Sequence, residues 1–221
     1  MPQMESSSIL PKGRFTKLLI LLLGMLVLAP LLDGFFHLRM LDDLFLTAVF
    51  IYATYSLSRD KRLLAAGICL ALPAIVLTWW CMITETAWLS IAAGLCDMVF
   101  ILTISVAILS YIFRQKQVST DMIAGAIIVY LLMAVMWAQI FFVLELLRPG
   151  QFAFPAGNGT DIRPQLRYFS LVTITTVGYG DITPLSPGAR AFANLEAVMG
   201  QLYLVIQVAW LVGMHVSVRS R

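Results

Sequence analysis

The sequence predicts an all-α membrane protein with six transmembrane helices and one re-entrant helix. Of its 221 residues, 60% are hydrophobic and only 12% are charged, and the mean hydropathy is +0.89. Soluble domains usually carry about a quarter charged residues, so this composition excludes an ordinary soluble domain. Six apolar stretches approach the roughly 20 residues that a helix needs to cross a bilayer. A seventh helical segment, between the last two, is too short to cross.

The expected spans cover about residues 15–32, 41–58, 63–83, 88–113, 120–147 and 187–216. A polar loop rich in glycine and proline, 148–167, follows the fifth span, and residues 164–176 fit the short helix. Non-helical backbone at membrane depth is tolerated only where it is buried in protein or lines a cavity. The segment after the short helix is therefore expected to line one. We divide the chain into a tail (1–14), a four-helix bundle (15–116) and a C-terminal module (117–221).

Basic residues predict the orientation, because cytoplasmic loops carry an excess of Lys and Arg. Ten of them flank one set of helix ends: Lys12, Arg14, Lys17, Arg59, Lys61, Arg62, Arg114, Lys116, Arg219 and Arg221. Five flank the other: Arg39, Arg148, Arg163, Arg167 and Arg190. We expect a multi-pass protein of the cell (inner) membrane with both termini in the cytoplasm. Residues 17–30 also resemble a signal peptide, but Pro30 directly after the candidate cleavage site favours an uncleaved span.

The most informative segment is Thr176-Val177-Gly178-Tyr179-Gly180. Backbone carbonyls can replace the water around a potassium ion if they all point at one axis. Glycine reaches the positive φ that such a strand needs, so Gly178 and Gly180 let carbonyls turn inward. Val177 and Tyr179 are expected to point outward, and Thr176 to add its hydroxyl oxygen. One chain supplies one wall, so further copies of this wall must surround the axis. The family resemblance described next implies a homotetramer, with K⁺ as the permeant ion and no cofactor.

Residues 120–216 resemble the pore module of the potassium-channel family, on this run and on residues around it: Tyr168, Phe169, Asp181, Pro184, Arg190 and Gly200. The resemblance implies that residues 164–180 are a pore helix and selectivity filter. It implies that Tyr168, Phe169 and Asp181 support the filter, with the Tyr168 hydroxyl bonded to the carboxylate. Gly200 falls at the family's inner-helix hinge. The whole layout is similar to six-span tetrameric channels, and most of all to small bacterial ion-channel proteins.

The same resemblance assigns one face of the last span to the pore: Gln201, Leu204, Val208, Val212 and Val216. Their spacing of three or four residues keeps them on one helical face. Apolar rings at such positions can close a pore by dewetting. Ordinary apolar packing of the helix is the alternative interpretation.

The fourth span, 88–113, departs from the voltage-gated members of the family, because it contains no Lys or Arg. Moving one charge through 100 mV is worth about 2.3 kcal/mol, and steep gating needs several such charges. Strong voltage gating is therefore not expected. This span carries Asp97 instead, either as a structural, hydrogen-bonded residue of the bundle or as a proton or ligand sensor.

Two further titratable residues lie in the last span. Glu196 precedes Gly200 by one turn and is expected behind the filter, where a hydroxyl of Thr173 or Thr175 would bond it. It either braces the pore helix against the inner helix or senses protons. His215 is either an interfacial residue or a sensor at the cytoplasmic mouth.

The expected function is a potassium-selective channel that passes ions passively and is not an enzyme. Its expected partners are K⁺, membrane lipids and three further copies of the chain, with no nucleic acid. The alternative is a non-conducting membrane sensor or partner subunit that uses the N-terminal bundle. An energised transporter is a third possibility, but such proteins usually have repeated halves, and the sequence holds no second filter-like segment.

Overall fold

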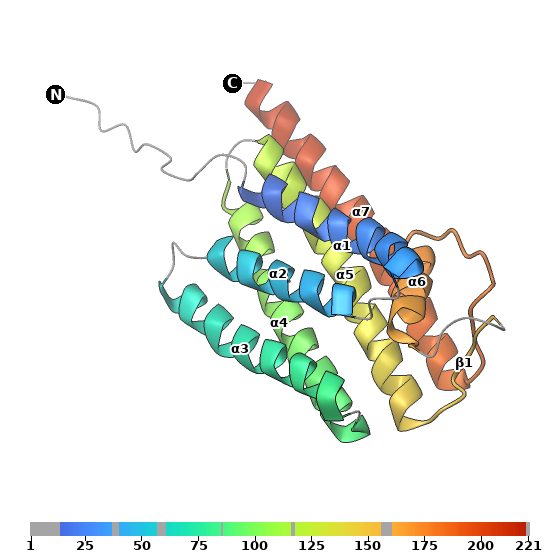
Figure 1. Cartoon of the computed structure of the whole chain (residues 1–221). Coiled ribbons are helices and arrows are strands. Elements are labelled where there is room, and N and C mark those ends of the chain that lie inside the picture. The colour runs from blue at the N-terminus through green and yellow to red at the C-terminus, as the bar shows by residue number, and fades with distance from the viewer. Residues whose placement is uncertain are drawn as a thin grey trace.

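The computed structural model describes residues 14–36, 40–56, 61–84, 86–115, 118–155 and 161–219. Seven helices and two short strands make up this part of the chain (Figure 1). The helices are α1 (Arg14–Phe36), α2 (Met40–Ser56), α3 (Lys61–Thr84), α4 (Ala87–Phe113), α5 (Thr120–Leu147), α6 (Arg163–Ile174) and α7 (Pro187–Arg219). The strands are β1 (Phe152–Ala153) and β2 (Thr183–Pro184), which pair antiparallel. The predicted all-α class is confirmed.

Among the described residues, five helices are long and apolar enough to cross a membrane. The qualifying stretches lie in α1, α3, α4, α5 and α7. The second expected span forms α2, of 17 residues, whose apolar part runs from Asp43 to Tyr55. That length is at the lower limit of about 17 residues for a spanning helix. A sixth span therefore stays a prediction.

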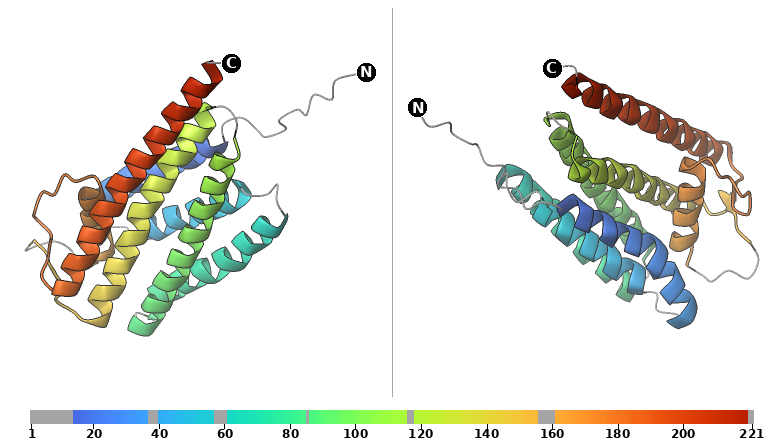
Figure 2. Two further views of the ribbon diagram at one scale, coloured as in Figure 1. Left: turned by 180° about the vertical axis from the view of Figure 1, so that it is seen from behind. Right: turned by 90° about the horizontal axis from the view of Figure 1, so that it is seen from above.

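Helix α5 lies between two groups of helices. It packs against α1 and α4 on one side and against α6 and α7 on the other, as the view from above shows (Figure 2). The larger apolar core joins α5 to the N-terminal helices. A smaller aromatic cluster joins α5 to β1 and α6 through Trp137, Phe141, Phe152, Leu166 and Phe169. The first of these cores holds the bundle together, and the second holds β1 and α6 against α5.

Two hydrogen-bonded caps position α5 and α1. Ser119 accepts a bond from the Met122 N–H at 3.2 Å and so begins α5. Asp121, in the first turn of α5, accepts bonds from the N–H groups of Phe15 at 3.0 Å and Thr16 at 3.4 Å. A carboxylate is favoured there because the amino-terminal end of α1 carries unpaired N–H groups and positive partial charge. The start of α1 is thus tied to the start of α5.

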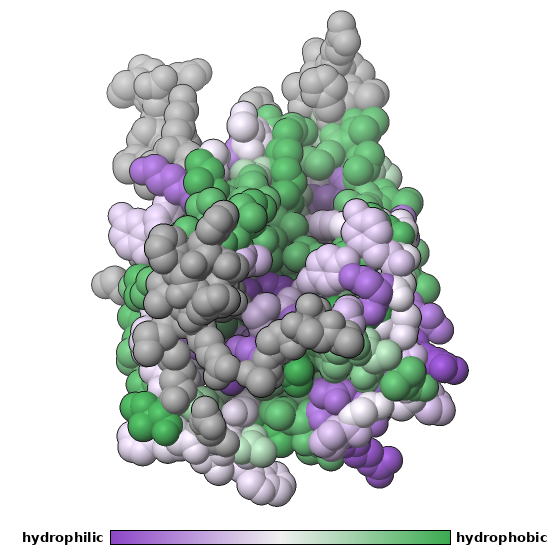
Figure 3. Space-filling model, turned by 45° about the vertical axis from the view of Figure 1, so that its right-hand side comes forward, coloured by the Kyte–Doolittle hydropathy of each residue, from purple (hydrophilic) through white to green (hydrophobic). Residues whose placement is uncertain are grey.

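Helix α7 is the least covered of the long helices. In the apolar 18-residue window that qualifies α7 as a span, 11% of the residues are buried, compared with 50% in the corresponding window of α5. The buried residues repeat every three, four or seven positions and face α5 and α6: Ala189, Ala193, Glu196, Gly200 and Gln207. Most of its remaining surface is exposed and apolar, as is much of the face drawn in Figure 3. This surface is left to lipid or to other protein chains.

Candidate functional site

Helix α6 is too short to cross a membrane. Its 12 residues span about 18 Å at 1.5 Å per residue, against the roughly 30 Å of a bilayer core. The helix ends at Ile174, two residues before the predicted end. The Thr176 N–H bonds the Thr173 carbonyl at 2.9 Å, and the N–H groups of Val177 and Gly178 bond the Val172 carbonyl at 3.0 and 3.2 Å. These bonds turn the chain sharply away from the helix axis.

The backbone after this turn alternates in handedness. Thr176, Gly178 and Gly180 have φ of 60°, 57° and 81°, whereas the intervening Val177 and Tyr179 do not have positive φ. Alternation of this kind points successive peptide groups to one side of the chain. A regular strand would alternate them between its two sides. The five residues are therefore expected to offer a row of oxygens on one side, directly after the negatively polarised carboxyl end of α6.

Thr176 is the unexpected member of this row. The sequence predicts positive φ for the two glycines, but a β-branched residue in the left-handed region is a genuine outlier. Holding such a residue there takes on the order of 1–3 kcal/mol, which the surrounding structure must supply. The hydrogen bonds from Thr176, Val177 and Gly178 back to α6 are the contacts that do so.

Nothing in the described part of one chain covers the filter segment. The Val177 and Tyr179 side chains are 53% and 72% exposed. A Cβ added at Gly178 or Gly180 would meet no atom within 4 Å. One chain therefore forms an open wall rather than a closed site.

Tyr168 supports the outer end of the filter. Its hydroxyl donates to Asp181 Oδ2 at 2.8 Å, and Asp181 Oδ1 accepts from the Ile182 N–H at 3.0 Å. Its ring also stacks beside that of Tyr179, with centroids 6.5 Å apart and planes at 7°. The bond expected between Tyr168 and Asp181 is therefore present.

Phe169 does not contact the filter of its own chain and lies between α6 and α5. Its ring packs edge-on against Phe141, at 5.2 Å between centroids, and Phe152, at 5.4 Å. It is buried in the aromatic cluster between α5 and α6. Adjacent residues on a helix point about 100° apart, so only one of the two aromatics can face the filter of its own chain. Phe169 anchors α6 to α5 instead.

Two tyrosines tie the end of α6 and helix α7 to α5. The Tyr130 hydroxyl on α5 donates to the Ile174 carbonyl at 2.9 Å, which satisfies one of the free carbonyls at the end of α6. The Tyr203 hydroxyl on α7 donates to the Ala126 carbonyl at 2.7 Å. Their rings stack with centroids 6.0 Å apart. Neither contact was predicted from the sequence, although a tyrosine within an apolar span usually needs a hydrogen-bond partner.

Gly200 marks a close approach between α7 and the end of α6. A Cβ there would lie 2.5 Å from Ile174 Cγ1 and 3.0 Å from the Ile174 carbonyl oxygen. The absence of a side chain therefore allows the inner helix to touch the base of the filter. Its role as a hinge stays a prediction.

Glu196 is fully buried behind the filter, but its partner differs from the prediction. The hydroxyl in contact with its Oε1 is that of Ser170 on α6. Thr175 instead donates to the Leu171 carbonyl of its own helix at 2.6 Å. Ser170 lies further back along α6 than either predicted threonine, and local spacing does not reveal how deeply α7 packs against the helix.

The pore-lining residues assigned from the sequence lie on an exposed face of α7 beside its buried stripe. Gln201, Leu204, Val208 and Val212 are all exposed within one chain. Val216 and His215 belong to α7, but they lie outside the residues whose side chains are described. An exposed, mostly apolar helix face is consistent with either a pore lining or packing against another chain.

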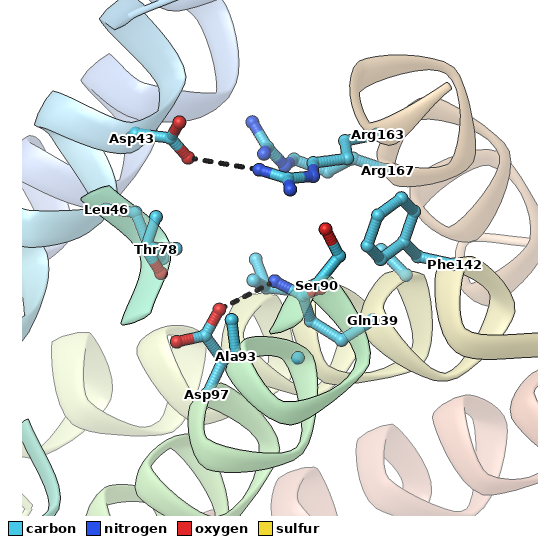
Figure 4. Close-up of a pocket in the computed structure, with 13 residues that line it drawn as sticks. Asp43, Leu46, Thr78, Ser90, Ala93, Asp97, Gln139, Phe142, Arg163 and Arg167 are labelled. Carbon is cyan, nitrogen blue, oxygen red and sulfur yellow. Dashed lines mark hydrogen bonds and ion pairs between the residues drawn. The ribbon is translucent and has the colours of Figure 1, made fainter. Parts of the chain in front are cut away.

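A polar cavity joins the bundle to α6. Figure 4 shows Arg163 and Arg167 reaching from α6 over this cavity. Arg163 forms an ion pair with Asp43 of α2, with 3.6 Å between Nη1 and Oδ1, and its guanidinium lies over the Phe142 ring at 4.9 Å. The cavity volume is about 20 Å³, enough for one water molecule. The contact brings together residues of the first and last thirds of the chain.

Asp97 forms the floor of this cavity and is only 3% exposed. Its Oδ2 accepts a bond from Gln139 Nε2 on α5 at 3.2 Å (Figure 4). Its Oδ1 has no hydrogen-bond partner among the described residues. Asp97 therefore has the hydrogen-bond partner that a structural role in the bundle requires, namely Gln139. A sensor role for Asp97 stays a hypothesis.

Glu145 organises the loop on the outer side of α6. Its carboxylate accepts bonds from the N–H groups of Gly150, Gln151 and Phe152 at 2.6, 2.8 and 3.2 Å. The Gln151 carbonyl then accepts from the Leu185 N–H at 2.7 Å. The loop before α6 is thereby joined to the segment after the filter. No pattern in the sequence singled out Glu145, because its partners are backbone groups.

Comparison with known proteins agrees with this geometry. Residues 118–215, somewhat less than half of the chain, match the model of a protein family described as "Ion channel". "Two pore potassium channel c" of Oryza sativa subsp. japonica is 42% identical over 52 residues, which are 24% of this chain and 11% of that protein. "Potassium voltage-gated channel protein shk-1" of Caenorhabditis elegans is 47% identical over 45 residues, which are 20% of this chain and 8% of that protein. No solved structure matches the chain significantly.

Proposed function

We propose that the chain is one subunit of a homotetrameric, potassium-selective channel that passes ions passively. The observation that carries the proposal is the alternation of φ through Thr176, Gly178 and Gly180 at the carboxyl end of α6. Carbonyl oxygens on one side of a chain can take the place of the hydration shell of K⁺. The Thr176 hydroxyl adds a further oxygen at the inner end. Both curated relatives are potassium channels by name, which supports the same ion.

The exposure of the filter supports assembly around an axis. One chain leaves Val177, Tyr179 and the row of oxygens uncovered, and K⁺ needs oxygens on all sides to replace its water. Four copies would complete the ring. The uncovered apolar surface of α7 would then be shared between neighbouring subunits, the pore and lipid.

The proposed pathway below the filter follows α7. Gln201 would face the cavity beneath the filter, and Leu204, Val208, Val212 and Val216 would form rings toward the cytoplasm. In this arrangement both termini lie in the cytoplasm of a bacterial cell and the filter opens outward. Residues 15–116 form the bundle and 117–221 the pore module. Gly200 is the proposed hinge of α7.

Purified protein in liposomes with a potassium gradient tests this function. We expect rapid potassium flux without an energy source and a reversal potential that follows potassium over sodium. Gly178→Ala should abolish flux or selectivity, because the added Cβ meets no neighbour in its own chain but opposes a φ of 57°. Gly213→Ala, in an open part of α7, is the matched control and should conduct.

Two results would contradict the proposal in different ways. Equal permeability to sodium and potassium in the unmodified protein would refute selectivity while leaving a channel. Absence of any flux from correctly assembled protein would refute conduction and favour a membrane sensor or partner subunit. A flux that requires an energy source would indicate a transporter.

A further inference from the structure

The Ser170 hydroxyl is hydrogen-bonded to two oxygen atoms but has only one proton to donate. Ser170 Oγ lies 2.7 Å from the Ala134 carbonyl oxygen of α5 and is also hydrogen-bonded to Glu196 Oε1 of α7. A serine hydroxyl has one proton to donate, and a backbone carbonyl can only accept. The Ala134 contact must therefore use the serine proton. The Glu196 contact then needs a proton from the glutamate side.

An ionised carboxylate has no such proton, whereas a carboxylic acid has one. We propose that Glu196 is a neutral carboxylic acid that donates a hydrogen bond to Ser170 Oγ, while Ser170 donates to the Ala134 carbonyl. The resulting relay runs from α7 through α6 to α5. Its bearing on conduction rests on the proposed function, but the protonation state of Glu196 does not.

The surroundings of Glu196 agree with a neutral group. Glu196 and Ser170 are both fully buried within one chain, so neither water nor a neighbouring subunit reaches them. No cationic side chain pairs with Glu196 among the described residues, and its second oxygen, Oε2, has no hydrogen-bond partner there. An unpaired buried carboxylate is far less favourable than the corresponding acid.

The titratable neighbour of Glu196 on α5 does not change this assignment. Tyr130 interacts with Glu196 electrostatically, but its hydroxyl donates to the Ile174 carbonyl at 2.9 Å. Its single proton is therefore used at the end of α6. Tyr130 neither neutralises Glu196 nor provides it with a hydrogen bond.

The relay makes Glu196 a positioning residue for the filter. Ser170 lies one turn before Ile174, where α6 ends, and the filter begins at Thr176. A donor on α7 therefore holds the last turn of α6 at a fixed distance from both α5 and α7. An acid can do this without placing a negative charge behind the row of carbonyl oxygens, and so without a permanent competing site for the permeant cation.

Infrared spectroscopy of the assembled protein at neutral pH tests the protonation state directly. We expect a carbonyl band of a protonated carboxyl group that is lost in Glu196→Gln. Asp97→Asn is the matched control, because Asp97 is a buried carboxyl group in another long helix, α4, and the Glu196 band should remain in that variant. If Glu196→Gln leaves the protonated-carboxyl region unchanged, Glu196 is ionised and the proposal is wrong.

Potassium flux into liposomes tests the positioning role. The glutamine amide can donate the same bond, so Glu196→Gln should keep flux within about twofold of the unmodified protein. Glu196→Leu and Ser170→Ala break the relay and should each lower flux roughly tenfold, since a buried group loses its partner. If the glutamine variant loses as much flux as the leucine variant, a neutral donor is not what the site needs. If the unmodified protein does not conduct, the proposed function fails, and the infrared band still decides the protonation of Glu196.

Discussion

The hydroxyl of Tyr168 and the carboxylate of Asp181 meet at 2.8 Å, one on α6 and the other directly after the filter. The residues between them form the last part of α6 and the whole filter. A single hydrogen bond therefore closes a loop around the segment in which φ alternates. The same tyrosine ring stacks beside Tyr179, so one side chain restrains the filter by both a polar and an apolar contact.

Removal of the Tyr168 hydroxyl should destabilise the conducting shape of the filter. Tyr168→Phe keeps the ring contact with Tyr179 and loses a bond to a charged group that is worth about 1.5–3 kcal/mol. We expect faster loss of current during sustained opening, with little change in selectivity. Asp181→Asn should act in the same direction, and the double variant should be less than additive. Currents as steady as those of the unmodified protein in both single variants would show that the bond restrains nothing.

Gly200 should tolerate a methyl group much less well than Gly213 of the same helix. A Cβ at position 200 would lie 2.5 Å from Ile174 Cγ1, whereas one at position 213 meets nothing within 4 Å. Gly200→Ala should lower the stability of the assembled protein by about 1–3 kcal/mol, as overpacking does. Gly213→Ala should be neutral or stabilising by up to about 1 kcal/mol, because alanine favours helix. Thermal unfolding in detergent compares the two, and equal midpoints would contradict the close approach.

Arg163 and Asp43 should be energetically coupled across the boundary between the bundle and α6. Their ion pair spans 3.6 Å and both side chains are largely buried, at 27% and 12% exposure. A double-mutant cycle with Asp43→Asn and Arg163→Gln should give a coupling free energy of about 0.5–3 kcal/mol. Thermal unfolding of the four proteins measures it. Independent effects of the two substitutions would mean that this pair does not hold the bundle against α6.

The response of the proposed channel to voltage should be gradual. Helix α4 contains no Lys or Arg, and its charged residue, Asp97, is buried against Gln139. Between about −100 and +100 mV the open probability should change little, because no row of charges can move through the field. Single-channel recording in planar bilayers measures this directly. A steep sigmoidal conductance curve would reveal several gating charges that α4 does not provide.

The sequence was sufficient for features that depend on local spacing. Apolar runs predicted the helices, and the resemblance to potassium channels implied the bond between Tyr168 and Asp181, which the structure contains. Features set by tertiary packing were not accessible in this way. Ser170 reaches Glu196 across 26 residues and Gln139 reaches Asp97 across 42, and nothing in either local pattern identifies the partner. The resemblance to potassium channels assigned Phe169 to the support of the filter, but its direction on α6 places it in the aromatic cluster.

The left-handed Thr176 has a consequence for the durability of the filter. A threonine at φ of 60° is held against a local preference of on the order of 1–3 kcal/mol. Relaxing Thr176 would recover this free energy, so the strain narrows the free-energy gap between the observed backbone and a relaxed alternative. A ligand that binds one state alone stabilises that state by mass action, increasingly so as its concentration rises. In the proposed channel the permeant ion is such a ligand. Bound K⁺ would therefore stabilise the filter backbone through which it passes. The filter without K⁺ would be the form that loses this conformation most readily.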